Sequence, residues 1–276
     1  MHSLILTVHN KDFILSQVLE SIKQNTVNQY ELIVVLDGCN DESENILDNF
    51  IEQNKPLKIK KVYTPDVFET KANNAGLKEA TGDKVIIIQD DMIIKENEWN
   101  LRLEKPFDEF TDVFAVTASS AFNYRFNPSS VHVNLDPEID KEIGDCWSDI
   151  FIYESHINRS QGLSRNIFAV RNNVCRGPLM IDHNDLIKLN YFDEIFEPQD
   201  QDDADLCYRA YKELGKIVGA YWIDFISDVS WGGTRPDGKN PAEWLLKAHH
   251  KNTRIVFERH KDIILNENHD QNRVLK

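Results

Sequence analysis

Glycine and cysteine are both scarce in this sequence, with 11 and 4 residues among 276. Neither common phosphate-binding loop, each built from closely spaced glycines, is present, and a Gly-x-Ser-x-Gly nucleophile elbow is absent as well. The cysteines stand far apart and form no Cys-x-x-Cys pair: Cys39, Cys146, Cys175 and Cys207. This spacing argues against a zinc knuckle or a disulfide framework and predicts free thiols in a reducing compartment.

Long apolar runs and basic charge are lacking too. No run reaches the ~18 apolar residues that span a bilayer, and the apolar residues 1–8 are too few for a signal peptide and lack its basic leader. Acidic residues outnumber basic ones by 46 to 31, which gives a net charge of −15. Such a chain lacks the basic face that binds nucleic acid or anionic lipid through charge. We therefore expect a cytoplasmic protein with no nucleic-acid partner.

Strand-like and helix-like segments alternate through the first ~120 residues. The patterns predict strands at 4–8, 32–36, 59–63 and 85–88, and helices near 14–22, 46–51 and 71–80, the last of them capped by Thr70. Because the strands are continuously apolar rather than alternating, we expect them to be buried on both faces of a mostly parallel sheet that has helices on both sides. The predicted fold class is therefore α/β.

The periodicity fades between residues 119 and 176, where we expect a long functional or mobile loop. Its aromatic residues are candidates for a sugar-stacking wall, although core packing fits most of them better: Phe122, Tyr124, Phe126, Trp147, Phe151 and Tyr153. Regular patterns then return. They predict a strand at 177–181, a helix at 185–189, a helix from the acidic run at 200–205 to Leu214, a strand at 217–223 and a final helical segment.

Carboxylates follow two of the predicted strands directly. In open α/β sheets, ligands bind at the carboxyl ends of the strands. Asp90 and Asp91 come after the most hydrophobic strand, where their hard oxygen ligands suit Mg²⁺ or Mn²⁺, although a capping role is the plain alternative. Asp37 follows another strand, and with Gly38 it forms either part of a ligand site or an ordinary turn.

An acidic run at 200–205 opens one of the predicted helices and holds four aspartates. Aspartates in a first turn cap free N–H groups and complement the helix dipole. Four exceed what capping needs, so their repulsion must be offset by other groups, and a raised pKa on one of them would suit a general base. His249 and His250 are adjacent, which makes a poor metal pair on a helix, and we expect them at the surface.

Taken in order, these segments resemble the family 2 glycosyltransferases, which have the GT-A fold. The likeness covers residues 3–235 with a gap in the middle, and it rests on the following segments. They are Leu-Thr-Val-His-Asn at 6–10, the strand and Asp-Gly-Cys-Asn-Asp at 31–41, Asn-x-Gly at 74–76, Ala-Thr-Gly-Asp at 80–83, the strand at 85–92, Gly-Pro-Leu-Met-Ile at 177–181, Phe-Asp-Glu-x-Phe at 192–196 and Asp-Asp-Ala-Asp-Leu-Cys-x-Arg at 202–209.

The resemblance implies roles for particular residues. The nucleotide-sugar donor would be bordered by Thr7, Asn10, Asp37, Asn74 and Asp90, with Asp37 accepting a base N–H. Asp91 would hold Mn²⁺ or Mg²⁺ on the donor diphosphate. Asp203 stands where the family places its catalytic base, and Asp202 replaces the usual glutamate beside it, where it would orient the acceptor.

Three departures from the family pattern bear on the metal and donor site. Gln89 occupies the first position of the Asp-x-Asp signature, Leu36 replaces the first aspartate of an Asp-Asp pair, and Ser230-Trp231-Gly232-Gly233 falls where many relatives offer a histidine. Because of Gln89, we expect metal binding to rest on Asp91 alone.

The resemblance predicts a single GT-A domain: a nucleotide-sugar-binding half at 1–118, an acceptor half with a mixed sheet at 119–235, and a helical tail at 236–276. The implied activity is inverting transfer of a sugar from a UDP- or dTDP-sugar to a hydroxyl of a glycan or lipid-linked glycan in polysaccharide biosynthesis. Peripheral membrane contact through a local patch is compatible with that acceptor. A sugar-nucleotide or glycan-binding protein without turnover and a nucleotidyltransferase are the alternatives.

Overall fold

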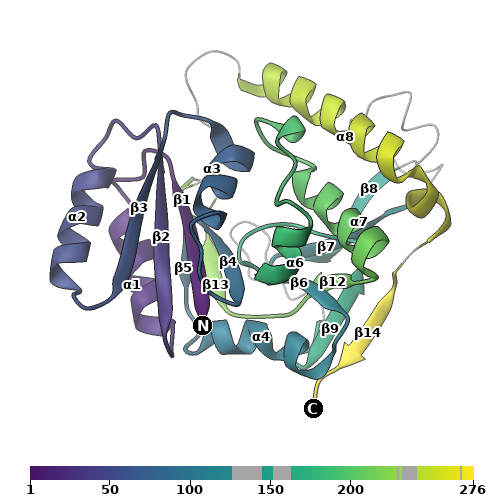
Figure 1. The fold of residues 1–276 in the computed structure, drawn as a ribbon, viewed down its shortest axis with the longest axis horizontal. Helices are drawn as coiled ribbons and strands as arrows, with labels where there is room; N and C mark the ends of the chain where they lie inside the picture. The colour runs from purple at the N-terminus through teal and green to yellow at the C-terminus, as the bar shows by residue number, and fades with distance from the viewer. Residues whose placement is uncertain (126–144, 152–162, 229, 232–240, 268) are drawn as a thin grey trace.

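The computed structural model describes residues 1–125, 145–151, 163–228, 230–231, 241–267 and 269–276. Its centre is a nine-stranded sheet (Figure 1). In spatial order the strands are β14 (Gln271–Val274), β9 (Ile167–Arg171), β12 (Ile217–Ala220), β6 (Val113–Thr117), β11 (Leu179–Asp182), β4 (Lys84–Gln89), β1 (His2–Val8), β2 (Tyr30–Asp37) and β3 (Lys58–Thr64).

The sheet has a parallel half and a mixed half, as the sequence predicted. Strands β4, β1, β2 and β3 are parallel neighbours, whereas β11 runs antiparallel to both β4 and β6. The sheet takes strands from all three predicted segments of the chain. The last of them, β14, pairs with β9 after the long helix α8 (Pro241–Asn266), so the tail contributes a strand as well as a helix (Figure 1).

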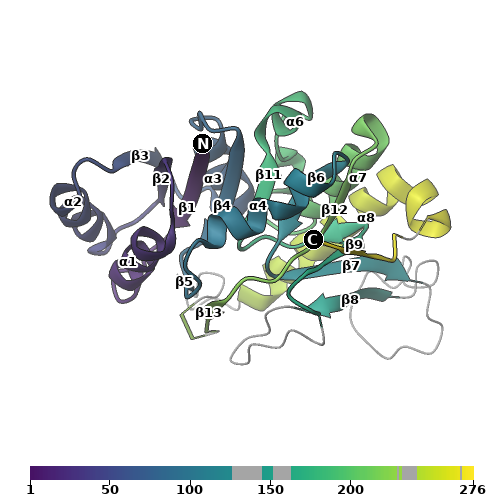
Figure 2. The same cartoon turned by 90° about the horizontal axis from the view of Figure 1, so that it is seen from below.

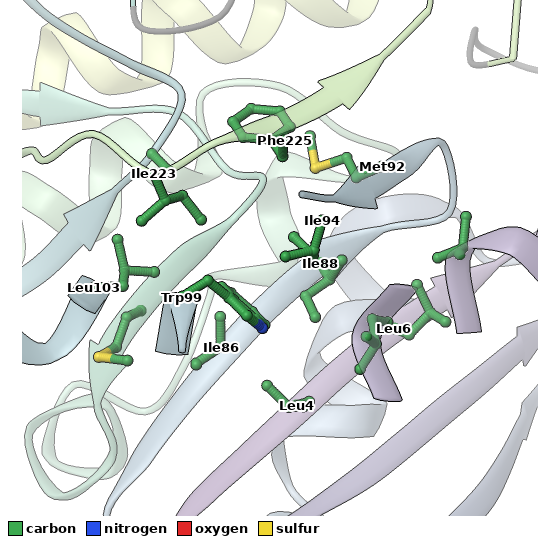
Figure 3. Packing of buried hydrophobic residues seen from close by; sticks show 14 of the residues in the cluster. Leu4, Leu6, Ile86, Ile88, Met92, Ile94, Trp99, Leu103, Ile223 and Phe225 are labelled. Atoms are coloured by element: carbon green, nitrogen blue, oxygen red, sulfur yellow. The ribbon is translucent and has the colours of Figure 1, made fainter. Parts of the chain in front are cut away.

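Helices cover both faces of the sheet because alternate strand residues point to opposite sides. On one face, even-numbered residues such as Leu6 and Ile88 pack with α1 (Leu15–Asn25), α2 (Ser43–Gln53) and α4 (Trp99–Glu109). Figure 3 shows Leu4, Leu6, Ile86 and Ile88 gathered beside Trp99. On the other face, Ile5 and Ile87 pack with α3 (Phe68–Leu77), α6 (His183–Lys188) and α7 (Asp202–Leu214).

The stretch 119–176 is not one long loop, and that expectation was wrong. Its described residues include β9 in the main sheet and a small sheet of β7 (Ser120–Arg125), β8 (Asp145–Phe151) and β10 (Asn173–Val174). Figure 2 shows β7 and β8 at the bottom of the view, away from α6 at the top. These strands find their partners in distant parts of the chain, as Ser120 of β7 does in Phe151 of β8 and Ala169 of β9 in Ala220 of β12, so local periodicity gave little sign of them.

The aromatic residues of this stretch divide accordingly. Phe122 and Tyr124 are buried in a core cluster, as core packing required. Phe126 and Tyr153 lie outside the described residues, and the structure does not describe the side chains of Trp147 and Phe151.

Two smaller expectations were also wrong. Helix α3 begins at Phe68, so Thr70 lies inside its first turn and is not its cap. The strand expected at 217–223 ends at Ala220. A separate short strand follows, β13 (Phe225–Ser227), and it pairs with β5 (Met92–Ile94).

Cys39, Cys175 and Cys207 are free thiols, as predicted, and the side chain of Cys146 lies outside the description. Within the described part of the chain, none of the helices combines the length and hydropathy of a bilayer-spanning segment.

Candidate active site

The carboxyl ends of β1, β2 and β4 meet at one edge of the sheet, which we name the donor edge. In register, Thr7 lies opposite both Val35 and Gln89. The backbone N–H of His9 donates to Asp90 Oδ2 over 3.0 Å, and Asn10 Oδ1 accepts the N–H of Asn40. The hydroxyl of Thr7 donates to Asn73 of α3. Thr7, Asn10, Asp37 and Asp90, all predicted from the sequence, therefore lie along one edge.

Asp37 is fully buried and its carboxylate faces the protein. It accepts the Thr64 hydroxyl at 2.7 Å and the backbone N–H groups of Val67 and Phe68 at 2.8 and 3.0 Å. These bonds fix the loop that leads into α3. Beside it, Gly38 has φ +60°, and an added Cβ would lie 2.5 Å from the Cβ of Asp66. Contact between Asp37 and a nucleotide base stays a prediction.

Asp90 and Asp91 occupy different surroundings. Burial raises the pKa of Asp90 to about 7, against the opposing effect of Lys11, whose Nζ is 3.6 Å from Asp90 Oδ1. Burial also raises the pKa of Asp91, which receives a hydrogen bond from Ser227. Asp91 Oδ1 is buried and has no hydrogen-bond partner among the described residues. An unsatisfied buried carboxylate oxygen is what a divalent cation would bind, so Asp91 fits a metal ligand.

A second group of potential ligands fits a cation less well. One atom each from His9, Asp37 and Asp66 lie within 4.8 Å of one another. The Asp37 oxygens, however, already accept three hydrogen bonds, and His9 Nδ1 is 2.5 Å from the Asp37 carbonyl oxygen. Between these two candidates, Asp91 is the better ligand.

In the acidic run at 200–205, cationic side chains offset the repulsion between aspartates, as the sequence predicted. Asp202 is fully buried and forms two hydrogen bonds with Arg176, at 2.6 and 2.7 Å. Asp205 is also fully buried and accepts from Arg209 at 2.7 Å and from His260 at 2.9 Å. Asp200 pairs with His249. Both His249 and His250 are half-buried rather than on the open surface.

Asp203 differs from its neighbours because it has no such arginine pair among the described residues. Its Oδ1 accepts the backbone N–H of Ala204 at 2.9 Å. Burial raises the pKa of Asp203 to about 7; the charge of Arg176 opposes this shift, and the charges of Asp202 and Asp200 add to it. A carboxylate with a pKa near neutrality is suited to accept a proton at physiological pH.

Among the described residues, Asn74 contacts the loop at Phe192 and Glu194 and not the donor edge. Its amide donates to the carbonyl of Phe192 at 2.9 Å and accepts the Phe192 N–H at 3.1 Å. It thereby holds the loop that leads to the short helix η1 (Glu194–Phe196). Its contact with the donor stays a prediction.

Sequence reasoning missed four polar residues of the site. Lys11 lies beside Asp90 and donates to the carbonyl of Trp231, and Ser227 bonds Asp91. Arg176 and Glu69 lie between the donor edge and α7. The only sequence feature that pointed toward Glu69 was Gln89, which stands where Asp-x-Asp has an aspartate. In the structure, the amide of Gln89 donates to Glu69 Oε1 at 3.0 Å.

Known proteins agree with this architecture. A structure of S. aureus TarS 1–349 in complex with UDP superposes with a TM-score of 0.56 at 16% identity, over 96% of this chain and 70% of that one. GalNAc-T7 with UDP, GalNAc and Mn²⁺ gives 0.63 at 13% identity, over 96% and 49%. The mannosyltransferase PcManGT of Pyrobaculum calidifontis with GDP-Man and Mn²⁺ gives 0.58 at 15%, over 96% and 67%. At these identities the likeness establishes the GT-A fold alone.

Sequence comparison goes further than fold. An uncharacterized glycosyltransferase of Haemophilus influenzae is 33% identical over 104 residues, which are 37% of this chain and 39% of that protein. Glycosyltransferase GlyG of Streptococcus pneumoniae serotype 4 is 30% identical over 95 residues, 34% and 31% of the two chains. The matches thus span less than two fifths of these curated relatives. The model of glycosyl transferase family 2 matches residues 3–167, more than half of the chain, and the protein therefore belongs to that family.

Proposed function

We propose that this chain is an inverting glycosyltransferase that moves a hexose from a nucleoside diphosphate sugar to a hydroxyl of a glycan or glycolipid. The observation that carries the proposal is Asp203, a carboxylate at the start of α7 with a pKa of about 7. Its neighbours Asp202 and Asp205 are neutralised by arginines. That leaves Asp203 to take up a proton.

The proposed reaction is one displacement. The acceptor hydroxyl oxygen bonds to the anomeric carbon as the bond from that carbon to the diphosphate oxygen breaks, and the bonding pair leaves with the nucleoside diphosphate. Asp203 takes the hydroxyl proton, which we expect to be worth about 10²–10⁴ in rate. Because the attack comes from the face opposite the leaving group, the configuration at the anomeric carbon inverts.

The donor edge suits the leaving group. Asp91 would hold a divalent cation, Mn²⁺ or Mg²⁺, which when bound stabilises negative charge on a departing diphosphate. Asp90 lines the same region and is tied to the backbone of His9. The nucleotide would lie along Thr7, Asn10 and Asp37, with Asn74 on the acceptor side. We favour a UDP- or dTDP-sugar, and the family resemblance supports that class.

Product analysis tests the proposal. The protein is incubated with Mn²⁺ and a panel of UDP-, dTDP- and GDP-sugars, with and without glycan acceptors, and nucleoside diphosphate is quantified. We expect release with one donor class and inversion at the anomeric carbon of the product. Measurable donor binding without release from any donor would favour a binding protein that lacks turnover, for which Gln89 and Leu36 are the motivating departures. Release of pyrophosphate would favour a nucleotidyltransferase.

A further inference from the structure

Arg176 is a buried cation between the donor edge and α7. It lies in the turn between β10 and β11 and is 8% exposed. Its guanidinium binds both oxygens of Asp202, at 2.6 and 2.7 Å, in the bidentate geometry that arginine forms with carboxylates. The ring of Phe192 lies 5.2 Å from the guanidinium carbon. The Asp202 side chain of this ion pair is 0% exposed to solvent.

The Asp202 carboxylate, which Arg176 holds in place, in turn binds the backbone of Asp203. Asp202 Oδ1 accepts the backbone N–H of Asp203 at 3.1 Å, and Oδ2 accepts the hydroxyl of Thr70 from α3 at 2.8 Å. The first turn of α7 is therefore held by Arg176 on one side and by α3 on the other. Asp203 projects from that turn, so its direction depends on these bonds.

A second contact of Arg176 leads to the donor edge. Its Nη2 is 3.5 Å from Glu69 Oε2, and Glu69 Oε1 accepts the amide of Gln89 at 3.0 Å. Gln89 is the last residue of β4 and stands two positions before Asp91. The contacts thus run without a break from β4 through α3 and Arg176 to α7.

The charges of this network explain why position 89 is neutral. Three carboxylates, Glu69, Asp202 and Asp203, neighbour the buried cation Arg176. An aspartate at position 89 would put a further carboxylate beside Glu69, and like charges this close inside a protein repel strongly. The amide of Gln89 instead offers Glu69 a hydrogen-bond donor.

We propose that Arg176 is a positioning residue, which fixes Asp203 relative to the donor edge through Asp202 and through Glu69 with Gln89. This inference rests on the proposed function. Arg176 acts here through other side chains and not on the reacting atoms. The competing explanation is a buried ion pair that serves stability alone.

The same helix offers a matched control for that alternative. Arg209 bonds the fully buried Asp205 at 2.7 Å and also donates to the carbonyls of Leu189 and Tyr191. Arg209 itself is half-buried, and it forms another pair with a fully buried aspartate on α7, without a contact to Glu69 or Asp203 among the described residues. Arg176→Lys and Arg209→Lys each keep the charge and lose the fork geometry of the guanidinium.

The first experiment compares these two variants. We expect both to lower the midpoint of thermal unfolding, and only Arg176→Lys to lower kcat, by about tenfold or more, with the KM for the donor changed less than about threefold, because small misplacement of a catalytic group acts on kcat. The carboxyl ¹³C resonance of Asp203, identified by its loss in Asp203→Asn, should shift in Arg176→Lys and keep its position in Arg209→Lys. Equal effects of the two variants on kcat and on this resonance would reduce Arg176 to a structural role.

The second experiment exchanges charge between Gln89 and Glu69. Gln89→Asp adds a carboxylate to the network, and we expect kcat to fall by about tenfold. Gln89→Asp combined with Glu69→Gln restores both the charge count and one hydrogen bond, so kcat should recover most of that loss. A Gln89→Asp variant as active as the wild type or more so, or a double variant no better than the single one, would overturn the proposal.

The Asp203 resonance is read without turnover. Failure of the proposed function, seen as no release from any donor, is therefore distinguishable from failure of this inference.

Discussion

Thr70 of α3 donates its hydroxyl to Asp202 of α7 over 2.8 Å, and both side chains are fully buried. The two residues are 132 positions apart in the chain. This bond joins the helix that packs on β1 and β2 to the helix that carries Asp203. A hydrogen bond to a buried carboxylate contributes more to the free energy of unfolding than one between neutral groups, because the bond replaces water that the carboxylate lost on burial.

Thr70→Val should therefore destabilise the fold. Valine keeps the shape of threonine and removes the donor, so we expect a loss of about 1.5–3 kcal/mol in the free energy of unfolding, the range for hydrogen bonds to charged groups. Urea or thermal unfolding measures it. Thr70→Ser keeps the hydroxyl and removes only a methyl group, so it should lose clearly less. If serine and valine cost the same, the hydroxyl is not what holds Asp202.

Asp203→Asn should abolish transfer and leave the donor bound. An asparagine cannot accept the acceptor proton, so the rate should fall by about 10²–10⁴-fold. The Kd of the nucleoside diphosphate, measured by calorimetry, should stay within about twofold, because the proposal puts Asp203 at the acceptor hydroxyl and not against the nucleotide. Retention of more than a tenth of the wild-type rate would show that another group serves as the base.

The pH profile of transfer should have an acid limb near neutrality. Asp203, with its pKa raised to about 7 by burial, works as a base only when ionised, so kcat/KM should fall as pH falls through about 7. Asp90 has a pKa of about 7 as well. Asp90→Asn separates the two groups, since the limb should remain in that variant. Loss of the limb in Asp90→Asn would assign it to the donor edge.

The raised pKa of Asp203 should also lower the stability of the fold as pH rises. The pKa of Asp203 is 3.8 for an ordinary aspartate and about 7 in the fold, so between these values the folded state holds a proton that the unfolded chain has lost. Stability from this group is therefore lost as pH rises through that window. Asp203→Asn should be more stable than the wild type at pH 8, by up to about 4 kcal/mol, since each pKa unit between 3.8 and about 7 is worth about 1.4 kcal/mol, and the gap should close toward pH 4. Unfolding midpoints of both proteins across that range test this, and a gap independent of pH would contradict it.

Much of the parallel half of the sheet could be predicted from local pattern. The run Val85–Ile88 is continuous, β-branched and followed by acids, and such a run is buried on both faces wherever it folds. The positions of Asp90, Asp91 and Asp203 followed from where their elements end or begin. Local signals also gave the end of α7, where Gly215 adopts φ +66°.

What local pattern could not give was pairing at long range. Nothing in the sequence near Arg176 indicates Asp202 or Glu69, which lie 26 and 107 positions away. Thr70 has the residue type of a helix cap, but its tertiary bond to Asp202 decided its place. Strand β9 is recognisable only by its neighbours β12 and β14. The site is thus assembled from residues whose roles are set by contacts across the fold.

Asp91 should confer stabilisation by a divalent cation. Its Oδ1 is buried without a hydrogen-bond partner among the described residues, and a cation would satisfy that oxygen. A ligand at 100 times its Kd adds about 2.7 kcal/mol to the free energy of unfolding, so Mn²⁺ with UDP should raise the unfolding midpoint of the wild type by several degrees, about 2–4 °C for each kcal/mol. Asp91→Asn should lose that rise. Asp90→Asn serves as the comparison: Asp90 lines the same site, but its Oδ2 already accepts the N–H of His9, so this variant should lose less of the rise than Asp91→Asn. A rise of equal size in Asp91→Asn would move the cation site elsewhere, with His9 and Asp66 as the next residues to replace.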